Sequence, residues 1–307
     1  MHFRIAAIVG MALICLSSIG SVHAQTAPTP GQALIDKIAP SVVTVRVVIK
    51  VEVKAGGQSQ TQETQIDTEG VAVTPDGLIM MSNAPISSDV LREMLGGGDD
   101  ERTSLSVSPT DFKITVGNEE KPYTGFLAAT DEKLGLAFVK IEDLAGRKLP
   151  AVDFSNCPPV NIGDQLAAVT RLGKGYDYAP VFSQGPVKGM VDKPRPAFLL
   201  STTIISVGLP VFTLDGNAVG MMVFLPMAED AESNSLDVMM RYYSGAAADR
   251  LGIFLIAGST VKPIIDEAID QAAKLTADRA KNPPPAPAPA PAAPAPKPAP
   301  AAPAPAK

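Results

Sequence analysis

The sequence predicts an all-β fold, either a sandwich or a pair of barrels. Apolar and polar residues alternate with a period of two over most of the chain, a pattern typical of half-buried β-strands. The runs are short and turn residues separate them, as in sandwiches and barrels. Only two segments have the spacing of a helix.

The first strands are predicted to pair as hairpins. Valine and isoleucine alternate with polar residues over 43–53, Gly56-Gly57 turns the chain, and residues 60–73 return. A turn is expected at Thr74-Pro75-Asp76-Gly77, because proline fixes φ and glycine accepts a positive φ. Further strands are predicted at 78–81, 112–116, 123–129, 136–141, 165–170, 182–191, 197–203, 211–213, 218–224 and 253–256.

Two helices are predicted, one short and one long. Residues 89–95 form the short one, which Gly96-Gly97-Gly98 ends, within a polar insertion that runs to about Thr110. The long helix is expected to begin at Ser259, a good N-cap. Its apolar residues share one face, which would pack on the strands: Val261, Ile264, Ile265, Ala268, Ile269 and Ala272.

The chain begins like a secretory signal peptide, predicted to span residues 1–24. Arg4 precedes an apolar run, and small residues follow up to Ala24, which is the pattern of a cleavable signal. The run is shorter than the ~20 residues that span a bilayer. We therefore expect an exported protein, periplasmic or secreted, that starts at Gln25 and has no stable membrane insertion after cleavage.

The rest of the chain divides into a linker over 25–32, one domain over 33–281 and a tail over 282–307. The tail consists almost entirely of proline and alanine. It has nothing to bury, and its prolines remove helix and ladder hydrogen bonds, so a disordered, polyproline-II-like segment is expected. It is either an inert solubilising tail or a tether for a partner.

Signal cleavage would remove most of the reactive side chains. Both histidines of the chain, His2 and His23, and one of its two cysteines, Cys15, lie in the signal peptide, which leaves Cys157 alone. Without a histidine, the mature chain has no Ser-His-Asp or Cys-His couple and no imidazole zinc ligand. We expect no cofactor and no metal. A net charge of −6 and the lack of a basic cluster exclude nucleic acid as a partner.

Five segments in order along the chain resemble the trypsin-like protease domain of the HtrA/Deg family. They match its opening strand, the strands that lead to the catalytic histidine, the segment of the catalytic aspartate, the nucleophile loop with its hairpin, and the closing strand and helix. The segments are "IAPSVVTVRV", "EGVAVTPDGLIMMSNAPI", "ATDEKLGLAFVKI", "STTIISVGLPVFTLDGNAVGM" and "GIFLIAGSTVKPIIDEAI".

The resemblance implies two six-stranded antiparallel β-barrels with the active site between them. Barrel one would span about 33–148, barrel two about 149–258, and the closing helix 259–281. The PDZ domain that usually follows in this family is replaced by the Pro/Ala tail.

Carried over residue by residue, the resemblance implies a site that has lost its catalytic groups. The family's histidine falls on Ala84, its aspartate on Gly135 and its serine on Val207. Thr130 and Asp131 match the residues that precede the family's aspartate. The glycine that shapes the oxyanion hole is replaced by Ile205, whose β-branch disfavours the backbone conformation needed there.

Other motifs have weaker chemical interpretations than structural ones. Ser259 and Lys262 match S-x-x-K but begin an ordinary helix, and Ser206 lacks a base. The remaining candidates are an aspartic-protease-like Asp67–Gly70, calcium-type acidic loops at 99–101 and 229–232, a phosphate-type turn at 173–175, copper-type methionine pairs at 80–81, 221–222 and 239–240, and the Cys157 thiol.

Three functions fit the sequence. The first is a catalytically inactive homologue of a trypsin-like serine protease that acts as a binding or scaffold protein for a protein or peptide of the cell envelope. The second is a degenerate serine-type endopeptidase with residual or unrecognised activity. The third is a structural envelope protein that binds through its Pro/Ala tail.

Overall fold

The computed structural model describes residues 28–55, 58–88, 103–193, 195–201, 203–204, 206–224 and 253–282. Several predictions therefore lie outside the described residues: the signal peptide, the short helix at 89–95, both acidic loops, Met239-Met240, Ile205 and the tail beyond Asn282. No helix in the described ranges is long and apolar enough to cross a membrane.

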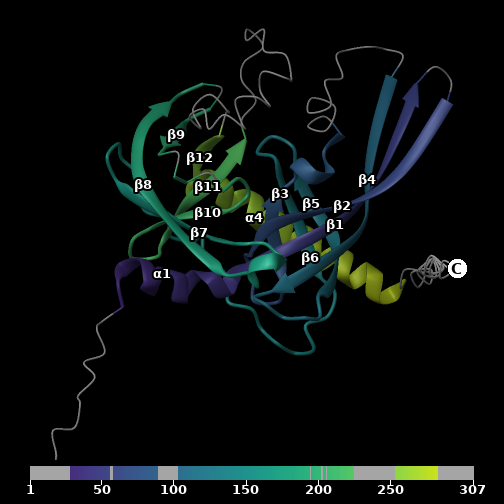
Figure 1. The fold of residues 1–307 in the computed structure, drawn as a ribbon, viewed down its shortest axis with the longest axis horizontal. Coiled ribbons are helices and arrows are strands. Elements are labelled where there is room, and N and C mark those ends of the chain that lie inside the picture. Colours follow the sequence, from purple (N-terminus) through teal and green to yellow (C-terminus); the bar gives the residue numbers. More distant parts are fainter. Residues whose placement is uncertain are drawn as a thin grey trace, which may run out of the picture.

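Twelve strands of the described chain form two closed antiparallel barrels, which confirms the predicted fold (Figure 1). Barrel one has the order β1-β2-β3-β6-β5-β4, and barrel two has the order β10-β11-β12-β9-β8-β7. The strands are β1 (Val42–Ala55), β2 (Gln58–Ala72), β3 (Leu78–Ser82), β4 (Thr103–Val116), β5 (Tyr123–Asp131), β6 (Leu136–Ile141), β7 (Gln165–Arg171), β8 (Pro180–Val191), β9 (Ala197–Leu200), β10 (Pro210–Thr213), β11 (Ala218–Phe224) and β12 (Ile253–Ala257).

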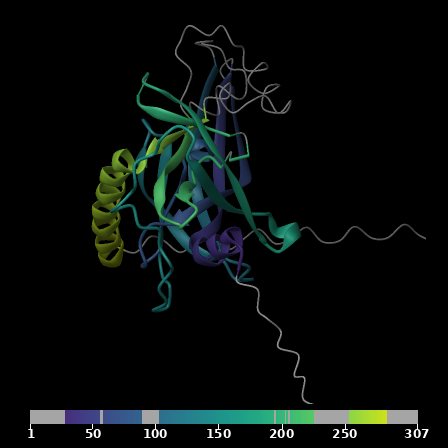
Figure 2. The same cartoon turned by 90° about the vertical axis from the view of Figure 1, so that its left-hand side faces the viewer.

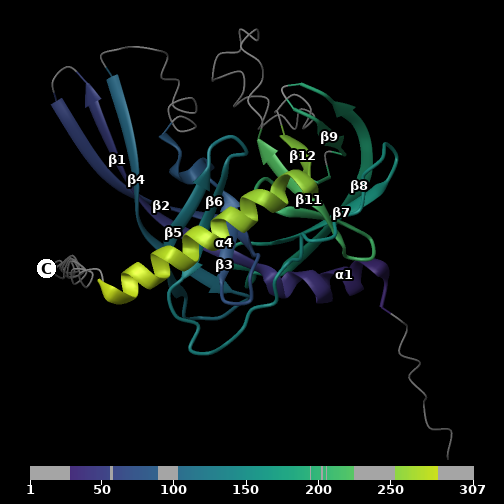
Figure 3. The same ribbon diagram turned by 180° about the vertical axis from the view of Figure 1, so that it is seen from behind.

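Two α-helices of the described chain pack on the barrels. The long helix α4 (Gly258–Lys281) crosses the back of the molecule and contacts β5 of barrel one as well as β11 and β12 of barrel two (Figure 3). Figure 2 shows the same helix standing along one side of the strands. At its C-terminal end, Arg279 pairs with Glu142 at 2.6 Å and lies 4.3 Å from the centre of the Phe126 ring. Helix α4 therefore ties the two barrels together.

The second helix, α1 (Pro30–Ile38), was not predicted from the sequence pattern. Thr29 caps it by accepting a hydrogen bond from the Gln32 amide, and Pro30 occupies the first position of the helix. Both are ordinary N-terminal signals, but they precede only nine residues. The helix buries Leu34 and Ile38 and contacts β7 and β8 of barrel two.

Two further expectations were wrong. Strand β4 begins at Thr103, so the polar stretch before residue 110 is not all insertion: its serines and threonines pair with β1. Helix α4 begins at Gly258 with Ala257 at the N-cap and no side-chain cap, so Ser259 is not the cap. The chain passes directly from β12 into the helix, which leaves no turn for a capping residue.

The largest core cluster joins the barrels to each other. It contains buried residues from both barrels and both helices, among them Leu34, Met80, Phe138, Phe212 and Val261. Two smaller clusters fill the separate interiors of barrel one and barrel two. Because a shared apolar interface is removed from water only when the barrels are docked, this cluster fixes their relative position.

A half-buried charged residue adds a polar link between the barrels. Arg171, at the end of β7, donates to the carbonyl oxygens of Ala39 at 2.6 Å, Val42 at 2.9 Å and Tyr178 at 2.9 Å. Its backbone amide donates to the Glu69 carboxylate of barrel one. Burial raises the pKa of Glu69, although the bond and the positive charge of Arg171 oppose that rise.

Candidate functional site

The first of the three predicted positions, Ala84, lies two residues after the end of strand β3. The strand ends at Ser82, and a 3-10 turn, η2 (Ala84–Ile86), comes next. Ser82 and Asn83 are both buried. The Ala84 amide donates to the Ser82 hydroxyl at 3.2 Å, and the Ile86 amide donates to the Asn83 carbonyl at 2.8 Å. This segment is therefore held by its own local bonds.

Gly135, the second position, lies against the same segment. Its carbonyl oxygen accepts a hydrogen bond from the Asn83 amide at 2.8 Å, while the Asn83 side chain donates to Glu132 at 3.0 Å. Gly135 has φ of +63°, a left-handed conformation that costs other residues energy. The turn that presents it is closed by Asp131, which accepts from the Leu134 amide at 2.7 Å.

Val207, the third position, belongs to the turn that enters β10 in barrel two. The neighbouring Gly208 donates its amide to Met222 at 2.8 Å and has φ of +85°. A Cβ on Gly208 would lie closer than 3.0 Å to the backbone nitrogen of Ser82, so the two barrels touch here. The Val207 side chain is half-buried and packs on the core cluster of barrel two.

The structure thus brings the three positions together around Ser82 and Asn83. Ala84 is the next residue, Gly135 is bonded to Asn83, and Val207 adjoins the glycine that contacts Ser82. These positions supply a methyl group, a bare backbone and an isopropyl group, none of which can transfer a proton or attack a carbonyl. Ile205, the predicted oxyanion-hole position, lies outside the described residues.

The other candidate residues have ordinary structural roles. Lys262 binds Asp266 one helical turn away, at 2.6 Å and 2.7 Å, so its bonds are not to Ser259. Asp67 forms a two-bond pair with Arg46 at 2.6 Å and 2.8 Å, which lowers the pKa of Asp67. The turn at 173–175 runs into the 3-10 turn η3 (Lys174–Tyr176).

The methionine pairs in the described strands fill cores. Met80 and Met221 belong to the shared cluster, whereas Met81 and Met222 belong to the separate interiors of barrel one and barrel two. Neighbouring residues of a strand point to opposite faces, so the members of each pair do not face one ion. Within the described ranges no three His, Cys, Asp or Glu side chains are grouped as metal ligands.

The Cys157 thiol is a poor nucleophile. It lies against Gly258 at the start of α4 and donates to the Phe154 carbonyl at 3.5 Å. Burial and the nearby Asp153 carboxylate raise the pKa of Cys157. A thiol with a raised pKa stays protonated at neutral pH and does not attack carbonyl carbons.

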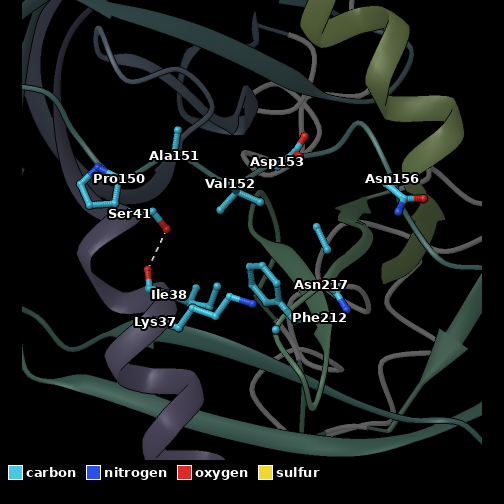
Figure 4. Close-up of a pocket in the computed structure, with 12 residues that line it drawn as sticks. Lys37, Ile38, Ser41, Pro150, Ala151, Val152, Asp153, Asn156, Phe212 and Asn217 are labelled. Atoms are coloured by element: carbon cyan, nitrogen blue, oxygen red, sulfur yellow. Dashed lines mark hydrogen bonds between the residues drawn. The ribbon is translucent and has the colours of Figure 1, made fainter.

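A cavity of about 350 Å³ lies away from the three positions (Figure 4). It is enclosed by α1, by the segment that connects the barrels and by the β10–β11 hairpin. Figure 4 shows the Lys37 side chain extending toward Phe212, and the Lys37 ammonium donates to the Asp215 carbonyl at 3.0 Å. Ala84, Gly135 and Val207 do not line this cavity.

Comparison with known proteins identifies the family. A family model described as a trypsin-like peptidase domain matches residues 68–221, which is half of the 307-residue chain. The match runs from β2 to β11 and includes all three predicted positions. No curated protein matches the chain. Together with the two closed six-stranded barrels, the match shows that the chain belongs to the family of trypsin-like peptidase domains.

Proposed function

We propose that this protein is a catalytically inactive member of the trypsin-like peptidase family that is exported and binds a polypeptide at the junction of its barrels. The observation that carries the proposal is the convergence of Ala84, Gly135 and Val207 on Ser82 and Asn83. The barrels keep the arrangement that would assemble a triad, but the assembled side chains have no acid, base or nucleophile.

The absence of a catalytic base does not depend on the exact alignment, because a shift of one residue in either direction gives no histidine. The neighbours of Ala84 in the same turn are Asn83 and Pro85, and neither carries an imidazole. The two histidines of the whole chain, His2 and His23, lie in its first 23 residues, in the segment proposed to be a signal peptide. Ser206 precedes Val207, but a serine without a base is a weak nucleophile.

Membership of this family favours a polypeptide ligand over a small molecule. In this family the site between the barrels receives a protein chain, and a domain that loses its triad loses bond cleavage without losing the surface around it. Because no bond is broken, a ligand held there would leave unchanged. The proposed place of action is the cell envelope, which follows from the signal peptide predicted over residues 1–24.

Purified mature protein is expected to show no hydrolysis of casein and no labelling by a serine-directed fluorophosphonate probe. Losing the triad removes nearly all of the rate of such enzymes. Trypsin labelled in parallel serves as the positive control. Stoichiometric labelling would favour the degenerate-peptidase function instead. Loss of that label in Ser206→Ala would identify the serine beside Val207 as a shifted nucleophile.

Binding at the barrel junction is tested by photo-crosslinking. A benzophenone amino acid at Val207 is expected to capture an envelope polypeptide, whereas the same group at the exposed Ile162 (66% exposed) is not. The comparison is made in the mature chain with and without residues 282–307. Capture that depends on the tail and is absent at Val207 would contradict the proposal and favour the tail-binding function.

A further inference from the structure

Three strands of barrel one continue well beyond the barrel. Strand β2 pairs with β3 only over Gly70–Ala72, and β4 pairs with β5 only over Phe112–Ile114. The outer parts of β2 and β4 remain paired with β1 up to its end at Ala55. They form a projecting three-stranded sheet in the order β2-β1-β4 (Figures 1 and 3). We call this sheet the arm.

One edge of the arm, along β4, is closed to further strands. Every second residue of β4 points its backbone N–H group away from β1. The register with β1 shows that positions 107 and 109 are among these residues. The Val107 amide already donates to the Ser88 hydroxyl at 3.1 Å. Position 109 is a proline, which has no N–H group. Both features block the addition of a strand.

The other edge, along β2, has no such protection in the described structure. The Val73 amide points away from β1, because it donates to Leu78 of β3. Backbone groups alternate in direction along a strand, so the amides of Ser59, Thr61, Glu63 and Gln65 point the same way. Residues 59–65 are all exposed. No described strand pairs with them on that side. We call residues 59–67 the β2 edge.

We propose that the β2 edge pairs antiparallel with the β2 edge of a second copy of this chain, about a two-fold axis at Gln62. The axis lies next to the middle of the edge, because charge excludes the middle itself. An axis at Glu63, the middle of the edge, would place two carboxylates opposite each other, and like charges in that position are destabilising. An axis at Gln62 places Gln62 opposite itself, Thr61 opposite Glu63, and Ser59 opposite Gln65.

The pairing makes one continuous six-stranded sheet from two arms. A two-fold axis perpendicular to the sheet keeps equivalent faces on the same side. Val51 and Val53 lie opposite Gln62 and Gln60 in the register and so share their face. Their half-buried side chains therefore flank the paired glutamines of the two β2 edges on one face of the joint sheet. The antiparallel direction places the two double-barrel bodies at opposite ends of the sheet.

The closed β4 edge explains why the partner would be a second copy and why assembly would stop at two. An arm with two open edges would add strands without limit, as in fibres. An arm with one open edge has no unpaired edge left once it pairs with the same edge of a second copy. The proposal does not depend on the proposed function, because the arm contains none of Ala84, Gly135 or Val207.

Sedimentation of the mature chain tests the pairing. The wild type is expected to sediment as a dimer. Thr61→Pro removes the outward N–H group of residue 61 and keeps every bond to β1. The dimer loses this group in both copies, so the substitution is expected to weaken dimerisation by about tenfold or more. Thr61→Val keeps the N–H group and is expected to remain dimeric. Circular dichroism and thermal melting of each variant establish that it is folded.

Charge variants at Gln62 test the position of the axis. Gln62→Lys and Gln62→Glu each place like charges opposite each other and are expected to be monomeric. An equal mixture is expected to form a heterodimer, detectable by native mass spectrometry. The proposal is overturned if the wild type is monomeric at all concentrations, if Thr61→Pro remains dimeric, or if the two charge variants fail to recombine.

Discussion

Replacing Gly220 with alanine is expected to lower the free energy of unfolding by about 3 kcal/mol, because it overpacks a closed strand pair. Gly220 lies in β11 between Val211 of β10 and Ala257 of β12. A Cβ there would lie closer than 3.0 Å to the Ile256 carbonyl oxygen and to the Leu255 side chain. The first contact is with backbone, so β11 and β12 would have to separate.

Urea unfolding and thermal melting measure this effect, and for a domain of this size the melting temperature should fall by about 6–12 °C. Gly189→Ala is the matched control, because Gly189 also lies in a strand but a Cβ on it would meet nothing within 4 Å. Its effect is expected to stay within about 0.5 kcal/mol. Equal losses in the two variants would show that the contact with Ile256 is not responsible.

Arg171→Met is expected to cost about 3 kcal/mol of stability at neutral pH, because three hydrogen bonds from a charged donor are lost and such bonds are stronger than neutral ones. The change removes this donor from the carbonyl oxygens of Val42 and Tyr178 and leaves the Ala39 carbonyl with the Val42 amide as its donor. It also removes the positive charge next to the half-buried Glu69 carboxylate. Both losses fall on the contact between the barrels.

The loss should depend on pH in a defined sense. Burial raises the pKa of Glu69 in the folded protein, and a carboxyl with a raised folded pKa loses stability as the pH rises through that value. Removing the guanidinium raises this pKa further. The difference between wild type and Arg171→Met should therefore grow from acidic to neutral pH, as followed by urea unfolding.

Arg46→Met is the control, because it removes an arginine of the same charge from an exposed ion pair. Its pair with Asp67 is 42% and 48% exposed, and such pairs contribute about 0–1 kcal/mol. Because the pair lowers the pKa of Asp67, its contribution is present above the unfolded pKa and is lost as the pH falls. A flat or inverted pH dependence for Arg171→Met would contradict the assignment of the inter-barrel link to Glu69.

The strands were largely predictable because period-2 alternation reports burial of one face directly. The alternating valines of β1 and the turn at Pro75-Asp76-Gly77 are local signals, and both appear where expected. The start of β4 was missed, because its outer residues are polar and owe their strand conformation to pairing with β1. That pairing connects residues far apart in the sequence, so no local pattern contains it.

The positions of the candidate site could be named only through the resemblance to a family. Ala84, Gly135 and Val207 have no pattern of their own, since they are notable for the side chains they lack. Their convergence depends on the contact of Gly208 with Ser82 and on the Asn83–Gly135 bond. Both are long-range contacts, which composition and spacing do not encode.

The position of α4 also has a consequence for the order in which the protein acquires its structure. This helix is the last described element of the chain, yet it packs on β5 of barrel one as well as on β11 and β12. The first barrel therefore stays incompletely covered until nearly the whole chain is available. Contacts between residues this far apart in the sequence slow folding, so a chain still being synthesised is expected to expose part of barrel one until its final helix docks.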